Sequence, residues 1–462
     1  MSMFRDLRDT AQKWKQLDPM PGPTPRPLVG NLLALPRPWP KTFLRDALVY
    51  GPVLRYRILF RPIVVVADPA LAAQVLSTRA ANYVKEPVTW KALSPLIGRT
   101  PVTHLEGTAW LTRRRQLEPL LATARTQELT QLIVAETARW LRRLESEPRA
   151  IDLVVEVERL ILNLLGKLFL GHDFGDYTAR ISDAFRVATT ELERRAFLAL
   201  PRWLRTLTPS NQRLTDALGY LKQVARERVL DAKRDPQPHS LITALLSAQP
   251  SDPTLTDETI AGELLAFLFA AHEPTAQAIT LACALLAENP RIQRRAHAHV
   301  DSALDGRPPS STDLPSLGYL AQVFDETVRL HPPAPLLARV ALAGDHLGEH
   351  QVPPGTTVLI SPWLLHHHPR YWDEPEAFLP ERFDESQSHT RPPFTYLPFS
   401  GGPRHCLGER FARQAATIIL SMIMQRAQLQ LIPGQRITTA PLLTNHISGK
   451  ILFTLRPRVA TN

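Results

Sequence analysis

Cys406 stands in a glycine-rich segment near the C-terminus that can bring a thiolate to the start of a helix. Residues 399–410 read FSGGPRHCLGER, with proline-rich sequence before them. From Arg410 to Gln425 the apolar residues have helical spacing, so we expect a loop that opens a helix. Free N–H groups and the positive end of the helix dipole favour an anion there, which stabilises the thiolate form that binds metals.

The neighbours of this cysteine suggest a large flat ligand. Gly401, Gly402 and Gly408 would let the backbone come close to such a molecule. Arg404, two residues before the thiol, can meet an anionic group on the same ligand. Taken alone, Cys406 also fits a buried structural cysteine in a glycine turn.

The pattern Phe-x-x-Gly-x-Arg-x-Cys-x-Gly resembles the haem-binding loop of the cytochrome P-450 family. Its fixed positions are filled by Phe399, Gly402, Arg404, Cys406 and Gly408. In that family the cysteine thiolate is the axial iron ligand. The resemblance therefore implies one haem b (iron protoporphyrin IX), with Cys406 as the metal ligand and the other four residues in contact with the cofactor.

Trp110 and Arg114 form the next candidate pair. Residues at i and i+4 share one face of a helix, so the two side chains project together. Alone they fit an ordinary amphipathic helix. Beside the cysteine loop they resemble the family's Trp-x-x-x-Arg, which holds the haem propionates. The resemblance also makes Arg339, in a predicted strand over 336–342, a cofactor-binding candidate.

A long helix is predicted over residues 256–289. Thr256 is a start signal, and Asn289 followed by Pro290 is a stop signal. The span is about 48 Å long at about 1.5 Å per residue. It is apolar on most sides, which predicts a buried helix, while Glu263 and His272 argue against a bilayer span.

The middle of this helix, AAHEPT over 270–275, resembles the oxygen-activating helix of the family. The usual pattern is Ala-Gly-x-Glu/Asp-Thr-Thr, so Ala271 replaces the glycine and Pro274 replaces the first threonine. The resemblance implies catalytic roles for Glu273 and Thr275, with Ala271 and Pro274 beside them.

The proline should change the local geometry. Pro274 has no N–H to donate to the carbonyl of Ala270, so we expect a kink and a freed carbonyl that can hold a water. Glu273 can then relay protons. Thr275 is rotated about 100° from Pro274 around the helix axis and should point elsewhere.

Glu326, Arg329 and Arg382 are candidates for a structural cluster. Glu326 and Arg329 are three residues apart on a predicted helix over 320–330, where a weak surface ion pair is the simplest interpretation. With Arg382 in a Pro-Glu-Arg-Phe sequence they resemble the family's Glu-x-x-Arg triad. The resemblance implies a buried triad that locks the haem-side core without a catalytic role. His367 and His368 resemble a family turn rather than a metal site.

The remaining sequence predicts a mainly helical protein with a small β region. A hairpin is expected over 53–67, a helix from Asp68 and Pro69, and a loop with a short helix over 82–103. Further predicted helices span 127–146, 152–170, 178–199 and 211–233, and short strands span 357–360 and 451–455. We expect a single cytochrome P-450 domain over 1–462, with a long central helix over the haem and a helix behind it starting at Cys406. The proline-rich residues at about 19–40 fit a linker or, by the resemblance, a packed lead-in.

The composition and the distribution of charge limit the kinds of molecule that this protein is expected to bind. The 462 residues are 44% apolar and 21% charged, with a net charge of +10. Basic residues are scattered in pairs without interleaved aromatic residues, so nucleic acid is not expected; an acidic partner or solubility explains the charge. Two cysteines argue for a reducing compartment, and Cys283 should lie in the core. The charged N-terminus predicts a cytoplasmic protein without a membrane span.

The implied function is monooxygenation of a hydrophobic small molecule with O₂. Electrons should come from separate proteins, a ferredoxin with its reductase or a flavodoxin-type donor, and a monomer is expected. Basic residues on the face behind the haem should dock the partner, with Arg113, Arg115 and Arg413 as candidates. The alternatives are a peroxide-driven peroxygenase, an O₂-independent isomerase or dehydratase, and a haem-based sensor. Candidate pocket walls are 88–97, 197–207, 267–271, 335–337 and 443–446.

Overall fold

The computed structural model describes residues 13–458, except 15, 18, 36–38, 60, 122–124, 146–149, 198–208, 389 and 442–443. The chain divides into two compact units. Unit 1 contains residues 1–86, 325–406 and 439–448, and unit 2 contains 87–324, 407–438 and 449–462. A single domain over the whole chain stays a prediction.

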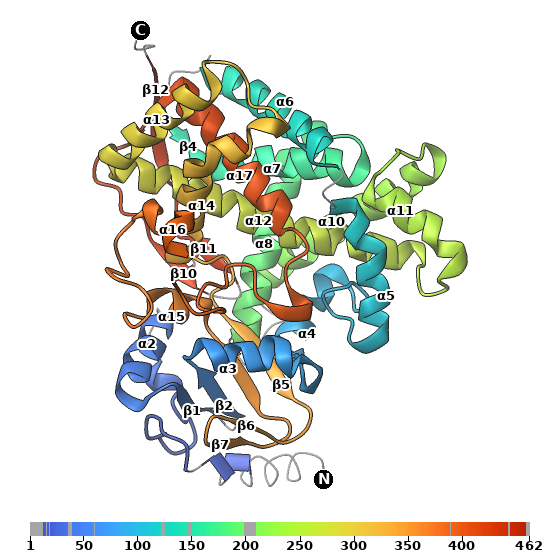
Figure 1. Cartoon of the computed structure of the whole chain (residues 1–462). Helices are drawn as coiled ribbons and strands as arrows, with labels where there is room; N and C mark the ends of the chain where they lie inside the picture. Colours follow the sequence, from blue (N-terminus) through green and yellow to red (C-terminus); the bar gives the residue numbers. More distant parts are fainter. Residues whose placement is uncertain are drawn as a thin grey trace. The chain divides into compact units, whose positions relative to one another are not determined.

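Unit 1 is built on a five-stranded sheet that combines strands from residues 53–85 with strands from residues 337–360. Figure 1 draws its early strands in blue and its later ones in orange. The order is β1 (Val53–Ile58), β2 (Arg61–Val66), β8 (Thr357–Ile360), β5 (Leu337–Ala341) and β3 (Tyr83–Lys85). The predicted hairpin is confirmed: β1 and β2 are antiparallel, with Val53 opposite Val66. β2 runs parallel to β8, and the valines of β2 are fully buried in the core of this unit.

Short helices and two further pairs of strands complete this unit. Asp68 caps α3 (Pro69–Ala73) as predicted, because its side chain accepts the N–H groups of Ala70 and Leu71 at 2.9 and 3.1 Å. The other elements are α2 (Trp39–Tyr50), α15 (Pro362–His367), α16 (Glu385–Ser388), β6 (Asp345–Leu347), β7 (His350–Val352), β10 (Thr439–Pro441) and β11 (Asn445–Ile447). Short 3₁₀ helices cover Pro380–Phe383 and Gly402–Arg404, and a π-helical turn covers Gln74–Thr78.

Unit 2 is mainly helical. Its helices are α4 (Pro87–Ile97), α5 (Gly107–Leu117), α6 (Thr126–Glu145), α7 (Leu153–Leu170), α8 (Thr178–Phe197), α10 (Pro209–Arg234), α11 (Leu241–Ala248), α12 (Asp257–Glu288), α13 (Pro290–Leu304) and α17 (Glu409–Arg426). A small sheet pairs β4 (Ile151–Asp152), β12 (Leu452–Pro457) and β9 (Ala427–Leu431). Helix α14 (Gly318–Leu330) begins in unit 2 and ends in unit 1.

The long helix predicted at 256–289 is confirmed as α12. The Thr256 side chain accepts the N–H of Thr259 at its start, and the helix continues without interruption through Pro274. It contacts α7, α10 and α17 inside unit 2 (Figure 1), which explains its apolar character. Cys283 is fully buried in it, as predicted, and burial raises the pKa of this thiol to about 12.

Two local predictions were wrong. Residues 82–103 contain strand β3 and the 11-residue helix α4, where a loop with a short helix was expected. Pro95 inside α4 is a residue that normally interrupts helices, so the sequence did not indicate the full length of this helix. Strand β3 forms because it pairs with β5, which is distant in the sequence. Helix α17 begins at Glu409 with Gly408 as its N-cap residue, so it does not start at Cys406.

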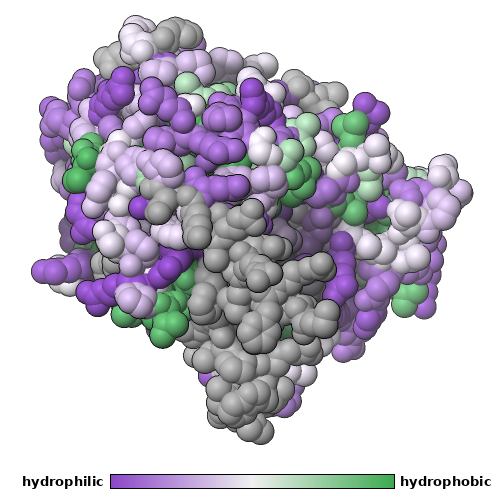
Figure 2. All heavy atoms as spheres, turned by 90° about the horizontal axis from the view of Figure 1, so that it is seen from below, coloured by the Kyte–Doolittle hydropathy of each residue, from purple (hydrophilic) through white to green (hydrophobic). Residues whose placement is uncertain are grey.

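Among the residues that Figure 2 colours, most on this face are hydrophilic, and the hydrophobic ones form small separate groups. Within the described part of the chain, no helix combines the length and the apolar character needed to cross a bilayer.

Candidate functional site

The backbone around Cys406 is held by its own hydrogen bonds. The N–H of Cys406 donates to the carbonyl of Phe399 at 3.0 Å, and that of His405 donates to Gly402 at 3.0 Å. The N–H of Ser400 donates to Leu397 at 3.2 Å. Cys406 itself is exposed, in contrast to Cys283, so the interpretation of Cys406 as a buried structural cysteine is wrong.

Two of the loop glycines are required by packing inside unit 1. Gly402 has φ +68°, and a Cβ placed on it would lie 2.0 Å from the carbonyl oxygen of Leu76. A Cβ on Gly401 would lie 2.7 Å from the Phe394 ring. The close approach that we expected for a flat ligand is therefore made, at these two positions, by the protein's own backbone and ring.

Ser400 is a feature of this loop that the sequence analysis missed. Its φ is +64°, in the left-handed region that non-glycine residues rarely adopt. Its hydroxyl is buried, with no hydrogen-bond partner among the described residues. A strained residue with an unsatisfied hydroxyl at a ligand loop marks a functional constraint. Serine carries no sequence signal for this conformation.

Glu326, Arg329 and Arg382 are joined in unit 1. Arg329 donates to both carboxylate oxygens of Glu326, at 2.6 and 2.8 Å, and both side chains are fully buried. Arg382 donates to the same carboxylate at 3.1 Å. The weak surface ion pair considered from the sequence is wrong, because burial makes each charge dependent on the others.

The buried guanidinium of Arg329 also binds backbone. It donates to the carbonyls of His366, Pro375 and Ala377 at 2.9, 2.7 and 3.1 Å. The N–H of Leu379 adds a further donor to Glu326, at 3.0 Å. The cluster thus holds the chain that leads from α15 toward the cysteine loop.

Trp110 and Arg114 share one face of α5 in unit 2. The guanidinium carbon of Arg114 lies 5.8 Å from the centre of the Trp110 ring, within cation–π range. Nε of Arg114 donates to Glu118 at 2.7 Å. Arg339 is a buried residue of β5 in unit 1, where its Nη1 donates to the carbonyl of Ala338 at 3.0 Å. All three side chains are thus held by identified neighbours.

The docking role expected for Arg113 is wrong. Its side chain is only 3% exposed, and it donates to Glu263 at 3.1 Å and lies 3.6 Å from Asp252. A buried arginine cannot meet a partner protein. Arg115 on the same helix is exposed, whereas Arg413 forms an ion pair with Glu409 at 2.8 Å.

Glu263 joins distant parts of unit 2. Its fully buried carboxylate accepts the N–H of Val102 at 3.0 Å in addition to Arg113. Burial raises its pKa to about 7, although both donors oppose the shift. The adjacent Gly262 lies so close to the carbonyl of Ile97 that a Cβ would be 2.8 Å from that oxygen. These two residues of α12 therefore hold the connection between α4 and α5.

The middle of α12 has one uncovered face. Ala270 is exposed, and Phe267, Ala271 and Pro274 are half-buried, whereas most of the helix is buried. These four positions share a face by helical spacing. Three of the four residues are small, which leaves room against this face.

The polar residues of the motif lie beside that face. Thr275 is buried, and the half-buried Glu273 accepts the side-chain N–H of Gln277 at 2.7 Å. His272 is buried, with Nε2 at 3.1 Å from the carbonyl of Glu158, and burial lowers its pKa to about 4. The histidine is therefore neutral at physiological pH.

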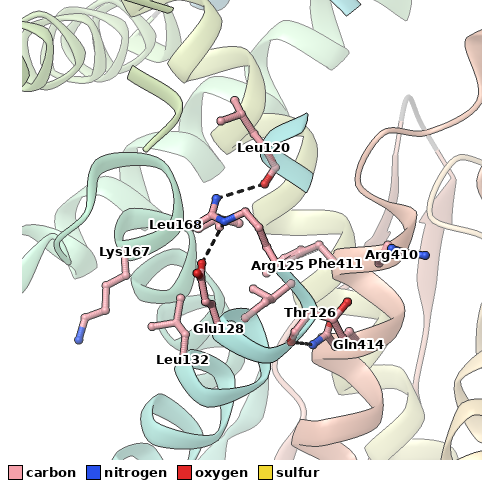
Figure 3. A pocket seen from close by; sticks show the side chains of 11 residues that line it. Leu120, Arg125, Thr126, Glu128, Leu132, Lys167, Leu168, Arg410, Phe411 and Gln414 are labelled. Atoms are coloured by element: carbon pink, nitrogen blue, oxygen red, sulfur yellow. Dashed lines mark hydrogen bonds and ion pairs between the residues drawn. The ribbon is translucent and has the colours of Figure 1, made fainter. Parts of the chain in front are cut away.

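A small cavity of about 100 Å³ lies at the first turns of α6 and α17 in unit 2. Figure 3 shows two of the residues that line it: Arg125 donates to Glu128 and to the carbonyl of Leu120, and Gln414 donates to Thr126. No predicted wall segment lines this cavity. Of those segments, 198–207 and 443 fall outside the described residues.

The donors present fit a haem-thiolate group better than another metal site. Cys406 supplies a single exposed soft ligand, which suits haem iron. Within unit 2, the uncovered face of α12 carries mostly small side chains, which leaves space beside this face. Among the described residues no cluster of His, Cys, Asp and Glu side chains could hold a metal ion by itself.

Comparison with known proteins gives the family. Residues 20–452 match the cytochrome P450 family, and the chain belongs to it. Cyclooctatin synthase of Streptomyces melanosporofaciens is 31% identical, over 90% of this chain and 91% of its own length. Cyclooctat-9-en-7-ol 5-monooxygenase of the same organism is 28% identical, over 88% and 89%. Carotene epsilon-monooxygenase, a chloroplastic protein of Arabidopsis thaliana, is 28% identical, over 88% and 80%.

The family and the mainly helical fold predicted from the sequence are thereby confirmed. The protein is a cytochrome P450 monooxygenase, an oxidoreductase with a haem-thiolate cofactor. Enzymes of this family act on a substrate with O₂ and electrons from redox partners.

Proposed function

We propose that this enzyme hydroxylates or otherwise oxidises a hydrophobic small molecule, using a haem b held by Cys406. The observation that carries the proposal is the exposed thiol in a hydrogen-bonded loop, because a ligand must be both reachable and fixed. The bound haem supplies the oxygen activation and oxygen transfer. The protein's own residues bind it, orient the substrate and deliver protons.

Cofactor binding is assigned to the candidate residues that the sequence motifs identified. Trp110 and Arg114 would hold the propionates, which the position of the Arg114 guanidinium over the Trp110 ring supports, and Arg339 would be a further contact of the cofactor. The remaining contacts are assigned to the loop residues Phe399, Gly402, Arg404 and Gly408. The propionate role predicts weaker haem retention in Arg114→Ala, and equal retention by wild type and variant would contradict it.

Proton delivery is assigned to the middle of α12. Glu273 is half-buried with a carboxylate oriented by Gln277, so it can hold and pass a proton. Pro274 leaves the carbonyl of Ala270 without its usual donor, and that oxygen can hold a water. The small side chain of Ala271 leaves room for this water, and Thr275 is buried to the side. The expected kink at Pro274 belongs to this proposal.

For the substrate we propose a large hydrocarbon-rich molecule of the terpenoid type. Two similar proteins carry carotene and cyclooctat-9-en-7-ol in their names, a polyene hydrocarbon and a cyclic alkenol. The face of α12 that we assign to the site carries Phe267, Ala270 and Ala271, which offer no charge to a polar substrate. Spectral titration with terpenes, fatty acids and steroids tests the class; tighter binding of fatty acids than of terpenes would reject it.

We propose separate electron donors of the ferredoxin or flavodoxin type, a monomeric protein and a cytoplasmic location. With Arg113 excluded, Arg115 and Arg413 remain the docking candidates, acting on the association rate. Electron-transfer rates should fall as salt rises, because exposed charges are screened. Turnover with NAD(P)H and surrogate donors supports the monooxygenase, whereas turnover with peroxide alone would support a peroxygenase instead.

A further inference from the structure

His366 links the buried ion-pair cluster to the loop that carries Cys406. It lies at the end of α15 and is fully buried. Its Nε2 is 2.8 Å from the backbone N of Leu397, and its Nδ1 is 3.2 Å from the carbonyl oxygen of Arg329. Both contacts lie within unit 1.

The partners fix the protonation of this ring. The backbone N–H of Leu397 can only donate, so Nε2 must accept and carry no proton. The carbonyl of Arg329 can only accept, so Nδ1 must carry the proton. Burial and the neighbouring charge of Arg329 lower the pKa of His366 well below its usual value, which keeps the imidazole in this neutral form.

One hydrogen-bond partner of His366 belongs to the buried ion-pair cluster, and the other is bonded to the start of the cysteine loop. Arg329 is the buried partner of Glu326, and its guanidinium also donates to the backbone carbonyl of His366. Leu397 is buried and its carbonyl accepts the N–H of Ser400, the strained residue that opens the cysteine loop. A continuous chain of hydrogen bonds therefore joins the ion-pair cluster to the start of the loop.

We propose that His366 is a positioning residue for Cys406. By accepting the N–H of Leu397 it fixes the start of the loop to the ion-pair cluster, and so holds the sulfur in one place. Without an acceptor, the buried N–H of Leu397 would be unsatisfied and the loop would move to find another partner. This inference rests on the proposed role of Cys406 as the iron ligand.

Two substitutions of His366 by amide side chains distinguish the positioning role from a role in packing alone. In His366→Gln the side-chain carbonyl can reach the place of Nε2 and accept from Leu397. In His366→Asn the shorter amide reaches only the place of Nδ1, so Arg329 keeps a donor and Leu397 loses its acceptor. His366→Leu removes both contacts. His367→Gln is the matched control, because His367 is buried beside it but bonds the carbonyl of Trp363 at 2.8 Å.

The experiment measures thiolate ligation in the purified holoprotein, and not turnover. The reduced CO complex gives the fraction with the long-wavelength Soret band, and maleimide labelling gives the rate at which Cys406 is released. Cys283 is fully buried and contributes little labelling. We expect wild type, His366→Gln and His367→Gln to retain the band, and His366→Asn and His366→Leu to lose much of it and to label about tenfold faster or more.

The outcomes separate this inference from the proposed function. If His366→Asn matches His366→Gln in both measurements, the acceptor role is wrong. The same holds if neither amide variant folds, since a packing role would then suffice. If only His366→Leu fails to fold, the comparison of His366→Gln with His366→Asn still tests whether His366 acts as the acceptor for Leu397. Wild-type protein without the long-wavelength band would reject Cys406 as the ligand, and with it the proposed function.

Discussion

Replacing Gly402 by alanine tests why the cysteine loop needs glycine. The residue has φ +68°, and alanine in the left-handed region costs about 1–2 kcal/mol. The added Cβ would also lie 2.0 Å from the carbonyl oxygen of Leu76 and 2.9 Å from the Cα of Ser77. Both of these atoms belong to backbone, so neither can rotate away as a side chain would.

The size of the effect follows from that overlap. Cβ atoms essentially never approach closer than 3.0 Å, so the loop or the π-helical turn must move by about 1 Å. Overpacking of this kind costs about 1–3 kcal/mol. We therefore expect Gly402→Ala to lose about 2–5 kcal/mol of unfolding free energy in total.

Gly348→Ala supplies the control. Gly348 lies in the same unit with φ +61°, and a Cβ there meets nothing within 4 Å. It should lose only the conformational part, about 1–2 kcal/mol. Urea denaturation of the two holoproteins, followed by far-UV circular dichroism and by the Soret band, measures the difference. Equal losses in the two variants would refute the packing argument.

Three further predictions concern other parts of the protein. Glu326→Ala leaves Arg329 buried without its counter-charge and should cost about 3–5 kcal/mol; a normal yield of stable holoprotein would count against the triad. The pKa of His272 is lowered from 6.5 to about 4, so the neutral ring contributes about 3 kcal/mol to the free energy of unfolding above pH 6.5, and this contribution is lost as pH falls toward 4. His272→Gln should therefore make the free energy of unfolding depend less on pH between pH 4 and 6.5. An unchanged pH dependence in this variant would contradict the prediction. Glu273→Ala should impair turnover while Thr275→Ala retains it, and Pro274→Thr should reduce peroxide release; loss of O₂-dependent turnover in Thr275→Ala alone would overturn the geometry assigned to α12.

Local signals predicted the elements that depend on neighbouring residues. Asp68 with Pro69 predicted the start of α3, and Thr256 with Asn289 predicted both ends of α12, because caps and breakers act within one turn. The hairpin was predictable for the same reason, since β1 and β2 are adjacent in the chain.

Distant partners account for what the sequence could not reveal. The sequence suggested that Arg113 is a surface charge, but its side chain is buried and forms an ion pair with Glu263, which is distant in the sequence. Strand β3 exists only through its pairing with β5. The motif identified the glycines of the cysteine loop but not why glycine is required at position 402. The reason is the backbone of Leu76, which lies close to Gly402 in space but more than three hundred residues earlier in the sequence. His366 stood in a run of histidines that gave no sign of its contact with Leu397.

The proposed function rests on Cys406 as the iron ligand, and the spectrum of the reduced CO complex tests this role. The wild-type protein should show the long-wavelength Soret band of thiolate ligation, and Cys283→Ala should keep it, because Cys283 is buried in α12. Cys406→His should abolish the band while haem still binds. Loss of the band in Cys283→Ala, together with its retention in Cys406→His, would show that Cys406 is not the iron ligand.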